Sequence, residues 1–556
     1  MQFPINPEQR STGLLLPRYG SGSGVSSKGR EIGLGFFWAM GRSMDQTFYY
    51  DYFSKYGIGV GHEFRYVRNS TSRGTFRTYF TRPKATAERP DVKEAFAYDV
   101  DWSATQALPH RFRATLSANF YEDPESRQQL QDSLDYASTR SRQASFGIQG
   151  SLGTVYTRLE ADTNDVFFGF NDTRQRRRHL PQLRLTQSQK KIGRSGFTYG
   201  FDATAAKLEQ GDENTIEGYT RIDAAPEISR PLSLTFLQVT PKALVRYTRY
   251  GASIAEDETL TGPSLDRRFF EGSVEMRGPK LFKVFSLPGD FYAEKFKHTI
   301  EPEAIYTYRS KVKAFDSIPS FDYNDQYPGT NQVLYGVTNR IYAKIKGPSG
   351  KPVTHEFLNW RISQTYYFDL GSKAGEYDPN YYSATFARGP GGAASHKSPI
   401  RSDLSLRPTT VSAVGLSIEY NPNFRQLSSF GLNARANYPR LTLQANWSRQ
   451  RNLSDVPEER TLISNTMRGN GRLVLWPERL TVEGSATYDA LQKRMLQSTA
   501  RIRYGVQCCG FAVEFVNFNY NKRTEKKTTF QIELAGIGGI GNFMGDNPAK
   551  QTNGRK

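Results

Sequence analysis

The sequence predicts an all-β fold, a single large antiparallel transmembrane β-barrel of about 26 strands. Two observations lead to this prediction. Many short segments alternate apolar with polar residues, and aromatic residues are abundant in a chain whose mean hydropathy is nevertheless low. A third observation excludes a helical membrane protein, because no window approaches the roughly 18 consecutive apolar residues that a spanning helix needs.

The alternation has a period of two residues, which places successive side chains on opposite faces of a strand. It is clearest in FRATLSANFY at 112–121 and LTLQANWS at 441–448, and it recurs in VGLSIEY at 414–420 and LTVEGSATY at 480–488. At the C-terminal end, TFQIEL at 529–534 sets Phe530, Ile532 and Leu534 against Thr529, Gln531 and Glu533. Turn-forming stretches such as YNPNF at 420–424 separate these segments.

Composition supports a membrane barrel over a soluble β-protein. Aromatic residues make up 13% of the chain, whereas the mean hydropathy is −0.62. In a barrel, aromatic residues form girdles at both membrane interfaces, and the polar residues belong to the lumen and the loops. A β-propeller would show a repeat of some 40–50 residues, and we find none.

The domain organisation follows from the strand pattern. A strand with its connection takes roughly 20–22 residues, which gives about two dozen strands or more, and a barrel of that width needs a plug. We expect residues 1–12 to be the end of a truncated periplasmic domain, 13–535 the barrel and 536–556 a tail. The opening MQFPINPEQR lacks the features of a secretory signal, so we expect the sequence to begin part-way along its parent.

Charge suggests an anionic partner. The chain has 74 Lys and Arg against 55 Asp and Glu, a net charge of +19, which fits nucleic acid or a phosphate-bearing lipid surface. The densest basic block, RQRRRH at 174–179, is most often a solvated loop, less often a phosphate-binding patch and rarely a nucleic-acid arm.

Enzyme and metal sites find little support. Six scattered histidines offer no pair at metal-ligand spacing. His62 and His355 each precede a glutamate, but neighbouring residues of a strand point to opposite faces. GIGGIG at 536–541 has dinucleotide-loop spacing but leaves only 15 residues after it, too few for the required helix and strand. We therefore expect no enzyme activity, no cofactor and no metal.

Two features remain to be explained. Pro17, in the expected first strand, cannot donate to a sheet ladder, so in a closed barrel it marks either a weakened seam or an ordinary strand entry. Cys508 and Cys509 are the only cysteines, and adjacent residues are poor partners for each other. They are free thiols, incidental buried residues, or partners of cysteines on a missing segment or another protein in an oxidising compartment.

Several segments occur in an order that is specific in combination. The chain resembles the lipopolysaccharide-assembly outer-membrane protein family, LptD or OstA, over essentially its whole length. The resembling segments are QFPINPEQRSTGLLLPRYG at 2–20, FFWAMGRSMDQTFYYDYFSKYGIGVGHEFRY at 36–66, HTIEPEAIYTY at 298–308, NQVLYGVTNRIYAK at 331–344, ISQTYYFD at 362–369, the cysteine pair at 508–509 and FQIEL at 530–534.

The resemblance implies a function and a set of site residues. It implies a translocon that inserts lipopolysaccharide into the outer leaflet of the Gram-negative outer membrane through a lateral opening between the first and last strands. Cys508 and Cys509 would form disulfides with cysteines of the missing periplasmic domain. Where the family has a second strand proline, this chain has Gly35, which weakens a strand but keeps its N–H donor. The implied lateral-gate residues are Pro17, Gly35, Phe530, Ile532 and Leu534.

The resemblance also implies partners: lipopolysaccharide, an LptE-like plug lipoprotein, an LptA-like periplasmic bridge joined through the missing domain, and the outer-membrane barrel-assembly machinery. We expect no nucleic-acid partner. The alternative function is a large passive porin or gated transporter barrel, which needs neither Pro17 at a seam nor a periplasmic cysteine pair. A soluble basic β-protein that binds nucleic acid would instead show steep salt dependence and need no detergent.

Overall fold

The computed structural model describes residues 12–534, with gaps at 26, 85–95, 169–172, 213, 290–291, 347–349, 371–394, 455–456, 478, 507–508 and 522. Residues 1–11 of the expected N-terminal segment 1–12, the expected tail 536–556 with its GIGGIG segment, and Cys508 lie outside the described residues.

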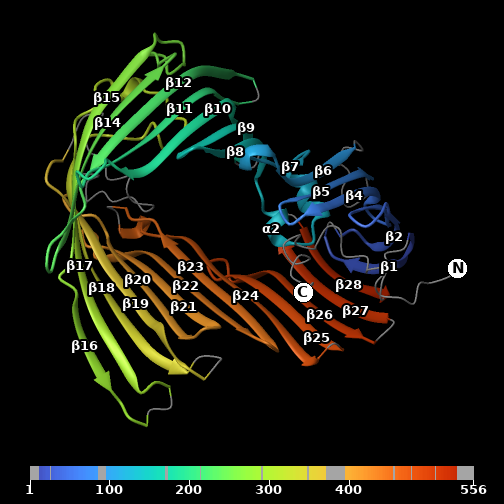
Figure 1. Ribbon diagram of the computed structural model, residues 1–556. Helices are drawn as coiled ribbons and strands as arrows, with labels where there is room; N and C mark the ends of the chain where they lie inside the picture. The colour runs from blue at the N-terminus through green and yellow to red at the C-terminus, as the bar shows by residue number, and fades with distance from the viewer. Residues whose placement is uncertain are drawn as a thin grey trace.

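Nearly all of the described chain belongs to one β-sheet (Figure 1). Its strands are β1 Gly13–Ser23, β2 Arg30–Ala39, β3 Met44–Phe53, β4 Gly57–Asn69, β5 Ser72–Pro83, β6 Ala97–Ala107, β7 Arg113–Tyr121, β8 Ser141–Leu152, β9 Val155–Phe168, β10 Thr173–Lys191, β11 Thr198–Gly211, β12 Ile216–Ser229, β13 Leu232–Ser233, β14 Gln238–Tyr250, β15 Leu265–Arg277, β16 Leu281–Ser286, β17 Lys295–Arg309, β18 Thr330–Lys346, β19 Pro352–Tyr367, β20 Ile400–Thr409, β21 Ser412–Asn421, β22 Gln426–Tyr438, β23 Leu441–Arg451, β24 Leu462–Trp476, β25 Leu480–Asp489, β26 Arg494–Gly505, β27 Cys509–Tyr520 and β28 Arg523–Leu534.

The sheet closes on itself as an antiparallel barrel. Neighbours in sequence pair around the wall, and β1 pairs with β28 to complete the circuit. Strand β13 continues β12 along β14, and β16 continues β15 along β17, so the 28 described strands make a wall 26 strands wide. This confirms the predicted fold class and strand number.

The alternation in sequence becomes alternation between bilayer and lumen. In β2, the side chains of Ile32, Leu34, Phe36 and Trp38 are exposed on the outer face, and the intervening residues are buried. In β28, Arg523, Glu525, Lys527, Thr529 and Gln531 are buried toward the lumen, whereas Phe530 and Ile532 are exposed outside. A lipid-facing wall therefore coexists with a polar interior, which explains the low mean hydropathy.

The two ends of the barrel differ. At one end the strands are joined by tight turns such as 70–71, 410–411 and 439–440, and β1 begins and β28 ends there. We call this the turn end. At the loop end the connections include 122–140, 251–264 and 310–329. Outer-membrane barrels place short turns on the periplasmic side.

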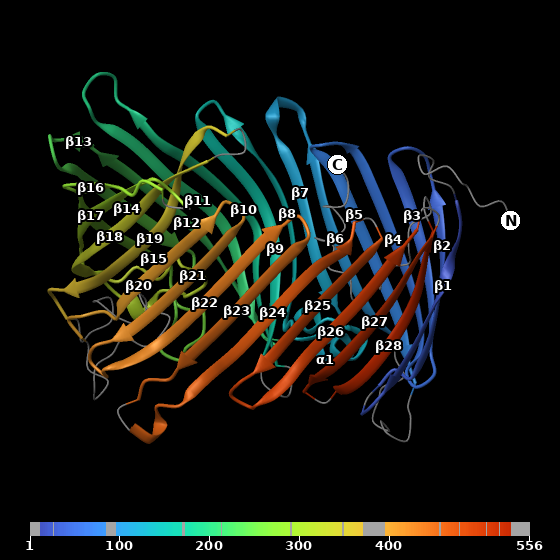
Figure 2. The same ribbon diagram turned by 90° about the horizontal axis from the view of Figure 1, so that it is seen from below.

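The described helices are short. They are α1 Pro124–Leu130, α2 Leu134–Ala137, η1 Pro109–Arg111, η2 Phe315–Ser317 and η5 Pro457–Glu459. In the described part of the chain, no helix is both long and apolar enough to cross a membrane. Helix α2 lies on the inner side of the wall (Figure 1), and α1 lies at the level of β25–β28 (Figure 2).

Candidate functional site

The seam between β1 and β28 is the candidate site, because its pairing is short. Residues 19–23 of β1 pair with residues 526–530 of β28, which makes five residue pairs. By comparison, β28 pairs with β27 along its whole length. Among the described residues, 13–18 of β1 and 531–534 of β28 have no pairing across the seam. The seam is therefore paired at the loop end and unpaired at the turn end.

A bulge coincides with the point where pairing stops. On its other edge, β1 pairs with β2, but the register shifts between Leu15 and Arg18, where Pro17 lies. One extra residue of β1 opposes β2 there. The buried, lumen-facing residues of β1 therefore have odd numbers before the bulge, as Leu15 does, and even numbers after it, as Arg18 does. Proline lacks the N–H that a continuous ladder would use. Gly35 is the β2 partner of Leu15 and is buried on the lumen face beside the bulge.

The outer face of the seam is apolar. Tyr19 pairs with Phe530, and both side chains are about half exposed, at 47% and 53%. Ile532 continues the same outer face of β28 beyond the last pair. Leu534 pairs with Cys509 through the backbone in the β27–β28 ladder. In the structure, Pro17 and Gly35 thus lie close together on the neighbouring strands β1 and β2. Phe530 and Ile532 lie on β28, on the other side of the seam.

The lumen face of the seam is charged. Glycines on β1 leave room for carboxylates: a Cβ on Gly20 would lie 2.6 Å from Cγ of Glu31, and one on Gly22 would lie 2.5 Å from Oε1 of Glu525. Lys527 of β28 reaches across the seam to Glu31 of β2, with Nζ 2.9 Å from Oε1. Both side chains are at most 3% exposed. A buried ion pair therefore joins the strands on either side of the seam.

Further pairs extend this network away from the seam. Arg18 of β1 lies 3.6 Å from Glu31 and donates to Asp51 of β3 at 3.0 Å. Tyr79 of β5 donates to Oδ2 of Asp51 at 2.7 Å. The inner wall is therefore tied together from β28 to β5.

Residues 122–140, which connect β7 to β8, fold over this network; we call them the strap. Asp132 of the strap contacts Lys28 Nζ at 2.7 Å, Arg523 Nη2 at 2.9 Å and Lys527 Nζ at 2.5 Å. Lys28 also donates to the backbone carbonyl of Leu130, and Arg523 donates to the backbone carbonyls of Gln128 and Gln131 in the strap. Burial alone would raise the pKa of Asp132, but the three cations hold it well below its usual range.

Apolar contacts seat the strap on both sides of the seam. Leu130 packs with Phe53, Tyr56 and Tyr79 near β3 and β5. Leu134 and Ala137 pack instead with Val516 and Phe518 of β27.

The sequence analysis did not predict the strap. One signal for it was present: Asp123, followed by Pro124, has the form of a helix N-cap with proline at the first position. In the structure, the Asp123 carboxylate accepts from the backbone N–H of Ser126 at 2.7 Å. The partners of Asp132 were not predictable, because Arg523 and Lys527 lie almost four hundred residues further along the chain.

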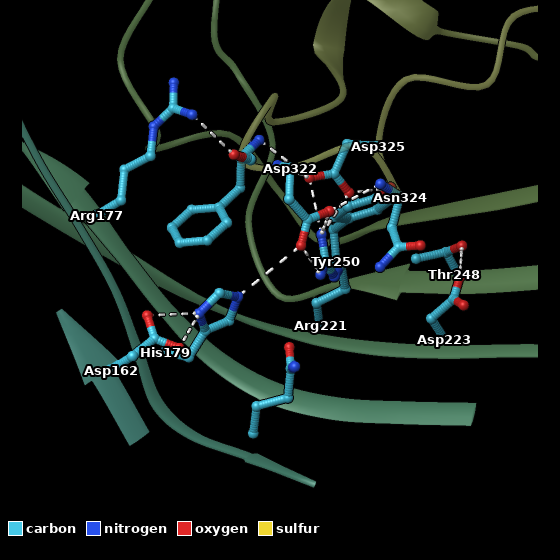
Figure 3. A network of polar contacts seen from close by, with 12 residues as sticks. Asp162, Arg177, His179, Arg221, Asp223, Thr248, Tyr250, Asp322, Asn324 and Asp325 are labelled. Atoms are coloured by element: carbon cyan, nitrogen blue, oxygen red, sulfur yellow. Dashed lines mark hydrogen bonds and ion pairs between the residues drawn. The ribbon is translucent and has the colours of Figure 1, made fainter. Parts of the chain in front are cut away.

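A second loop is fastened to lumen-facing residues of β12 and β14, many strands away from the seam along the wall. Figure 3 shows its polar contacts. Residues 310–329 connect β17 to β18, and their acidic groups meet inward-facing arginines. Arg221 of β12 contacts Asp325 at 2.8 Å and also pairs with Asp322. Tyr250 donates to Asp325 at 2.9 Å. Two connections, 122–140 and 310–329, are therefore fastened to lumen-facing side chains. The sequence analysis expected a plug from an LptE-like lipoprotein and predicted neither of these loops, and that lipoprotein remains a prediction.

The basic block at 174–179 was expected as a solvated loop, and that expectation is wrong. These residues lie in β10, a strand of 19 residues that pairs with both β9 and β11. Spanning a membrane needs only about ten residues per strand, so β10 has length to spare. Its charges are matched: Arg176 Nε contacts Asp165 at 2.8 Å, and His179 contacts Asp162 at 2.9 Å (Figure 3).

The predicted cysteine site is only partly described. Cys509 begins β27 at the turn end of the barrel, and Cys508 lies outside the described residues. The expected disulfides to an upstream domain remain a prediction. Among the described residues, no group of three His, Cys, Asp or Glu side chains is arranged to hold a metal ion.

Comparison with known proteins then identifies the family. The family model described as "LPS transport system D", LptD, matches residues 96–493, well over half of the chain. The chain belongs to the LptD family. It is an outer-membrane β-barrel of a Gram-negative bacterium, within a family concerned with transport.

Curated LptD relatives align over almost all of the chain. The LPS-assembly protein LptD of Azoarcus sp. (strain BH72) is 23% identical over 563 residues, covering 97% of this chain and 64% of that protein. The protein of the same name from Aromatoleum aromaticum is 24% identical, with the same coverage of both chains. That from Nitrosospira multiformis is 23% identical, covering 97% of this chain and 55% of the relative. The chain thus spans less than two thirds of the length of these LptD relatives.

Proposed function

We propose that this barrel inserts lipopolysaccharide into the outer leaflet of the outer membrane by opening laterally between β1 and β28. The observation that carries the proposal is the five-pair seam, which stops beside the β1–β2 bulge at Pro17 and has no further pairs toward the turn end among the described residues. Membership of the LptD family supports lipopolysaccharide as the cargo.

The physical reason for a lateral route lies in the two halves of the cargo. Acyl chains cross a polar lumen at high cost, and a phosphorylated sugar headgroup crosses hydrocarbon at higher cost. A seam lets the acyl chains move sideways into the bilayer while the headgroup stays in the lumen. Opening a sheet edge to lipid leaves backbone groups unsatisfied, so a gate is cheapest where few pairs must be broken. In this proposal, Pro17 and Gly35 limit the pairing near the gate, and Phe530, Ile532 and Leu534 form its β28 side.

The same proposal assigns the protein partners. An LptE-like lipoprotein would share the lumen with the two internal loops, and an LptA-like bridge would deliver cargo through the upstream domain. The outer-membrane barrel-assembly machinery would insert the barrel. Cys508 and Cys509 would bond to cysteines of that upstream domain, which agrees with the position of Cys509 at the turn end. No covalent chemistry and no cofactor enter this scheme.

A passive porin or gated transporter is the alternative. It would keep its seam closed to lipid and conduct solutes through the lumen. The seam geometry favours the translocon, because a porin gains nothing from a bulge and a shortened ladder at the closure.

Photo-crosslinking in the full-length protein tests the translocon. A crosslinking amino acid at Tyr19 or Phe530 should give lipopolysaccharide adducts in native envelopes, because both side chains face outward at the seam. Val245 of β14 is the matched control, since it is 54% exposed on the same outer face of another part of the wall. Equal labelling at all three positions, with free conduction of small solutes, would favour the porin.

A disulfide lock provides a second test. Because Tyr19 and Phe530 are direct partners in the ladder, Tyr19→Cys and Phe530→Cys together can form a bond across the seam. The oxidised double variant should stop lipopolysaccharide from reaching the cell surface, and reduction should restore it. Each single variant is a control. Normal surface delivery by the locked barrel would exclude a lateral route through this seam.

A further inference from the structure

Asp132 sits in a cradle of three buried cations on the lumen face of the seam. Its Oδ1 contacts Lys28 Nζ at 2.7 Å and Arg523 Nη2 at 2.9 Å, and its Oδ2 contacts Lys527 Nζ at 2.5 Å. All four side chains are at most 3% exposed. We call Lys28, Arg523 and Lys527 the cradle.

The charges around the cradle balance only while the strap is seated. The buried cluster holds four cations, Arg18 and the three cradle residues, against the carboxylates Glu31, Asp51, Asp132 and Glu525. Asp132 belongs to the strap, whereas the other seven belong to β1, β2, β3, β28 and the β1–β2 connection. If the strap leaves, four cations face three carboxylates. An unpaired buried charge is strongly unfavourable, so strap release calls for another anion.

The strap also holds the two sides of the seam together at the loop end. On the β1–β2 side, Lys28 donates to the carbonyl of Leu130 and to the carboxylate of Asp132. On the far side, Gln128 of the strap donates to the carbonyl of Tyr520 at 2.8 Å, and Arg523 donates to the carbonyls of Gln128 and Gln131. The paired half of the seam cannot part widely until the strap lets go of one side.

We propose that the cradle is a phosphate subsite of the gate, and that Asp132 is its resident occupant, displaced when a phosphate group of the transported amphiphile arrives. This inference rests on the proposed function. A phosphate group offers charge-assisted acceptor oxygens to the same three donors, as the Asp132 carboxylate does now. Displacement replaces the departing carboxylate with an anion of at least equal charge, so no cradle cation is left unmatched, and it frees the strap from the β28 side.

The exchange links gate opening to cargo chemistry. A ligand shifts a two-state equilibrium only if it binds one state better than the other. Phosphate competes with Asp132 for the cradle and so binds only the strap-released state. An uncharged amphiphile has no such preference, so the seam stays fastened at the loop end when phosphate-free lipid or solute fills the lumen.

Phosphate binding tests the cradle directly. In the full-length protein in detergent, Asp132→Asn keeps the shape of the side chain but leaves one cradle charge unmatched. Binding of inorganic phosphate is measured by equilibrium dialysis. The dissociation constant of this variant should be at least about tenfold lower than that of the wild type, which corresponds to about 1.4 kcal/mol of binding free energy. Asp135→Asn is the matched control, because it removes a strap carboxylate that pairs with the partly exposed Arg468 away from the cradle.

Two further variants make the binding test decisive. Asp132→Asn combined with Lys527→Met restores the charge balance and should lose the added phosphate affinity. Replacing residues 124–138 with a Gly-Ser linker exposes the cradle and should bind phosphate even if the Asp132→Asn protein folds poorly. Equal phosphate affinity in the wild type, Asp132→Asn and the linker variant would overturn the proposal.

A lipid experiment separates a headgroup ligand from free phosphate and separates this proposal from the proposed function. The probe is the rate of disulfide formation between Tyr19→Cys and Phe530→Cys, measured with phosphorylated lipid A, dephosphorylated lipid A or inorganic phosphate. We expect phosphorylated lipid A alone to slow the reaction, by about tenfold, and Lys527→Met to remove the difference between the two lipids. If both lipids slow the reaction equally, the seam opens but the cradle does not distinguish phosphorylated from dephosphorylated lipid. If neither lipid has any effect, lateral opening itself is refuted.

Discussion

Lys527→Met is the sharpest test of what closes the seam. The Lys527 ammonium contacts Asp132 at 2.5 Å and Glu31 at 2.9 Å, all three groups being almost fully buried. Methionine fills a similar volume without the charge. Removing one partner of a buried ion pair costs about 3–5 kcal/mol. Asp132 and Glu31 keep other cations nearby, so we expect the lower figure, about 3 kcal/mol.

A loss of about 3 kcal/mol is large compared with the free energy that backbone pairing contributes to closing the seam. Five residue pairs at a net of about 1 kcal/mol each give roughly 5 kcal/mol. The ion pairs of Lys527 should therefore supply a substantial part of the free energy that holds the seam closed. A loss of about 3 kcal/mol corresponds to roughly a hundredfold increase in the population of the open seam.

Hydrogen exchange measures this population. In detergent, those backbone amides of residues 19–23 and 526–530 that donate across the seam should exchange roughly a hundredfold faster in Lys527→Met than in the wild type. Amides of β18 and β19, on another part of the wall, should be unchanged. Lys526→Met is the matched control, because Lys526 is the next residue of β28 and faces outward. If Lys527→Met and Lys526→Met exchange alike, the charged network does not close the seam.

Three further results are expected. The depressed pKa of Asp132 means that its stabilising charge is fully present above its ordinary pKa of about 4 and is lost only as pH falls through the lower folded value; the difference in thermal mobility shift on gels between the wild type and Asp132→Asn should therefore stay constant from pH 8 to 5, and a change in that difference between pH 7 and 5 would contradict this assignment. Gly22→Ala should destabilise the barrel by about 1–3 kcal/mol, because the new methyl group meets the Glu525 carboxylate, whereas Gly13→Ala, which meets nothing within 4 Å, should melt like the wild type in the same gel assay. Arg221→Leu should release loop 310–329 and speed its cleavage in limited proteolysis by about a hundredfold or more, since buried Asp325 and partly buried Asp322 both lose their arginine partner; Arg249→Leu, at a loosely paired exposed site, should leave cleavage unchanged, and equal rates would show that Arg221 does not hold the loop.

The wall was predictable from sequence because its signal is local. Two-residue alternation and turn residues identify a strand without knowledge of its neighbours, and chain order then makes the first and last strands meet. The sequence also indicated a weak point at Pro17, because proline lacks the N–H donor that a sheet ladder uses. In the structure a bulge lies at this residue.

The lumen was less predictable because its contacts are long-range. Arg523, Glu525 and Lys527 could be assigned to the polar face of β28, but nothing in the local sequence names Asp132 as their partner. The error at 174–179 has a related cause. A run of arginines indicates a solvated loop only if matching carboxylates are absent, and here Asp165 and Glu209 lie on the neighbouring strands.

If the barrel opens laterally as proposed, the uneven seam sets an order of events. Cargo entering at the turn end would meet residues 13–18 and 531–534, for which the described part of the chain shows no pairing across the seam. Acyl chains can therefore reach the bilayer early, along the outer face that carries Phe530 and Ile532. The headgroup meets the opposite situation, because the loop-end half is held both by backbone pairs and by the strap. A phosphate that must exchange with Asp132 before this half parts would make release into the outer leaflet the last step, taken only when an anionic headgroup is already in place.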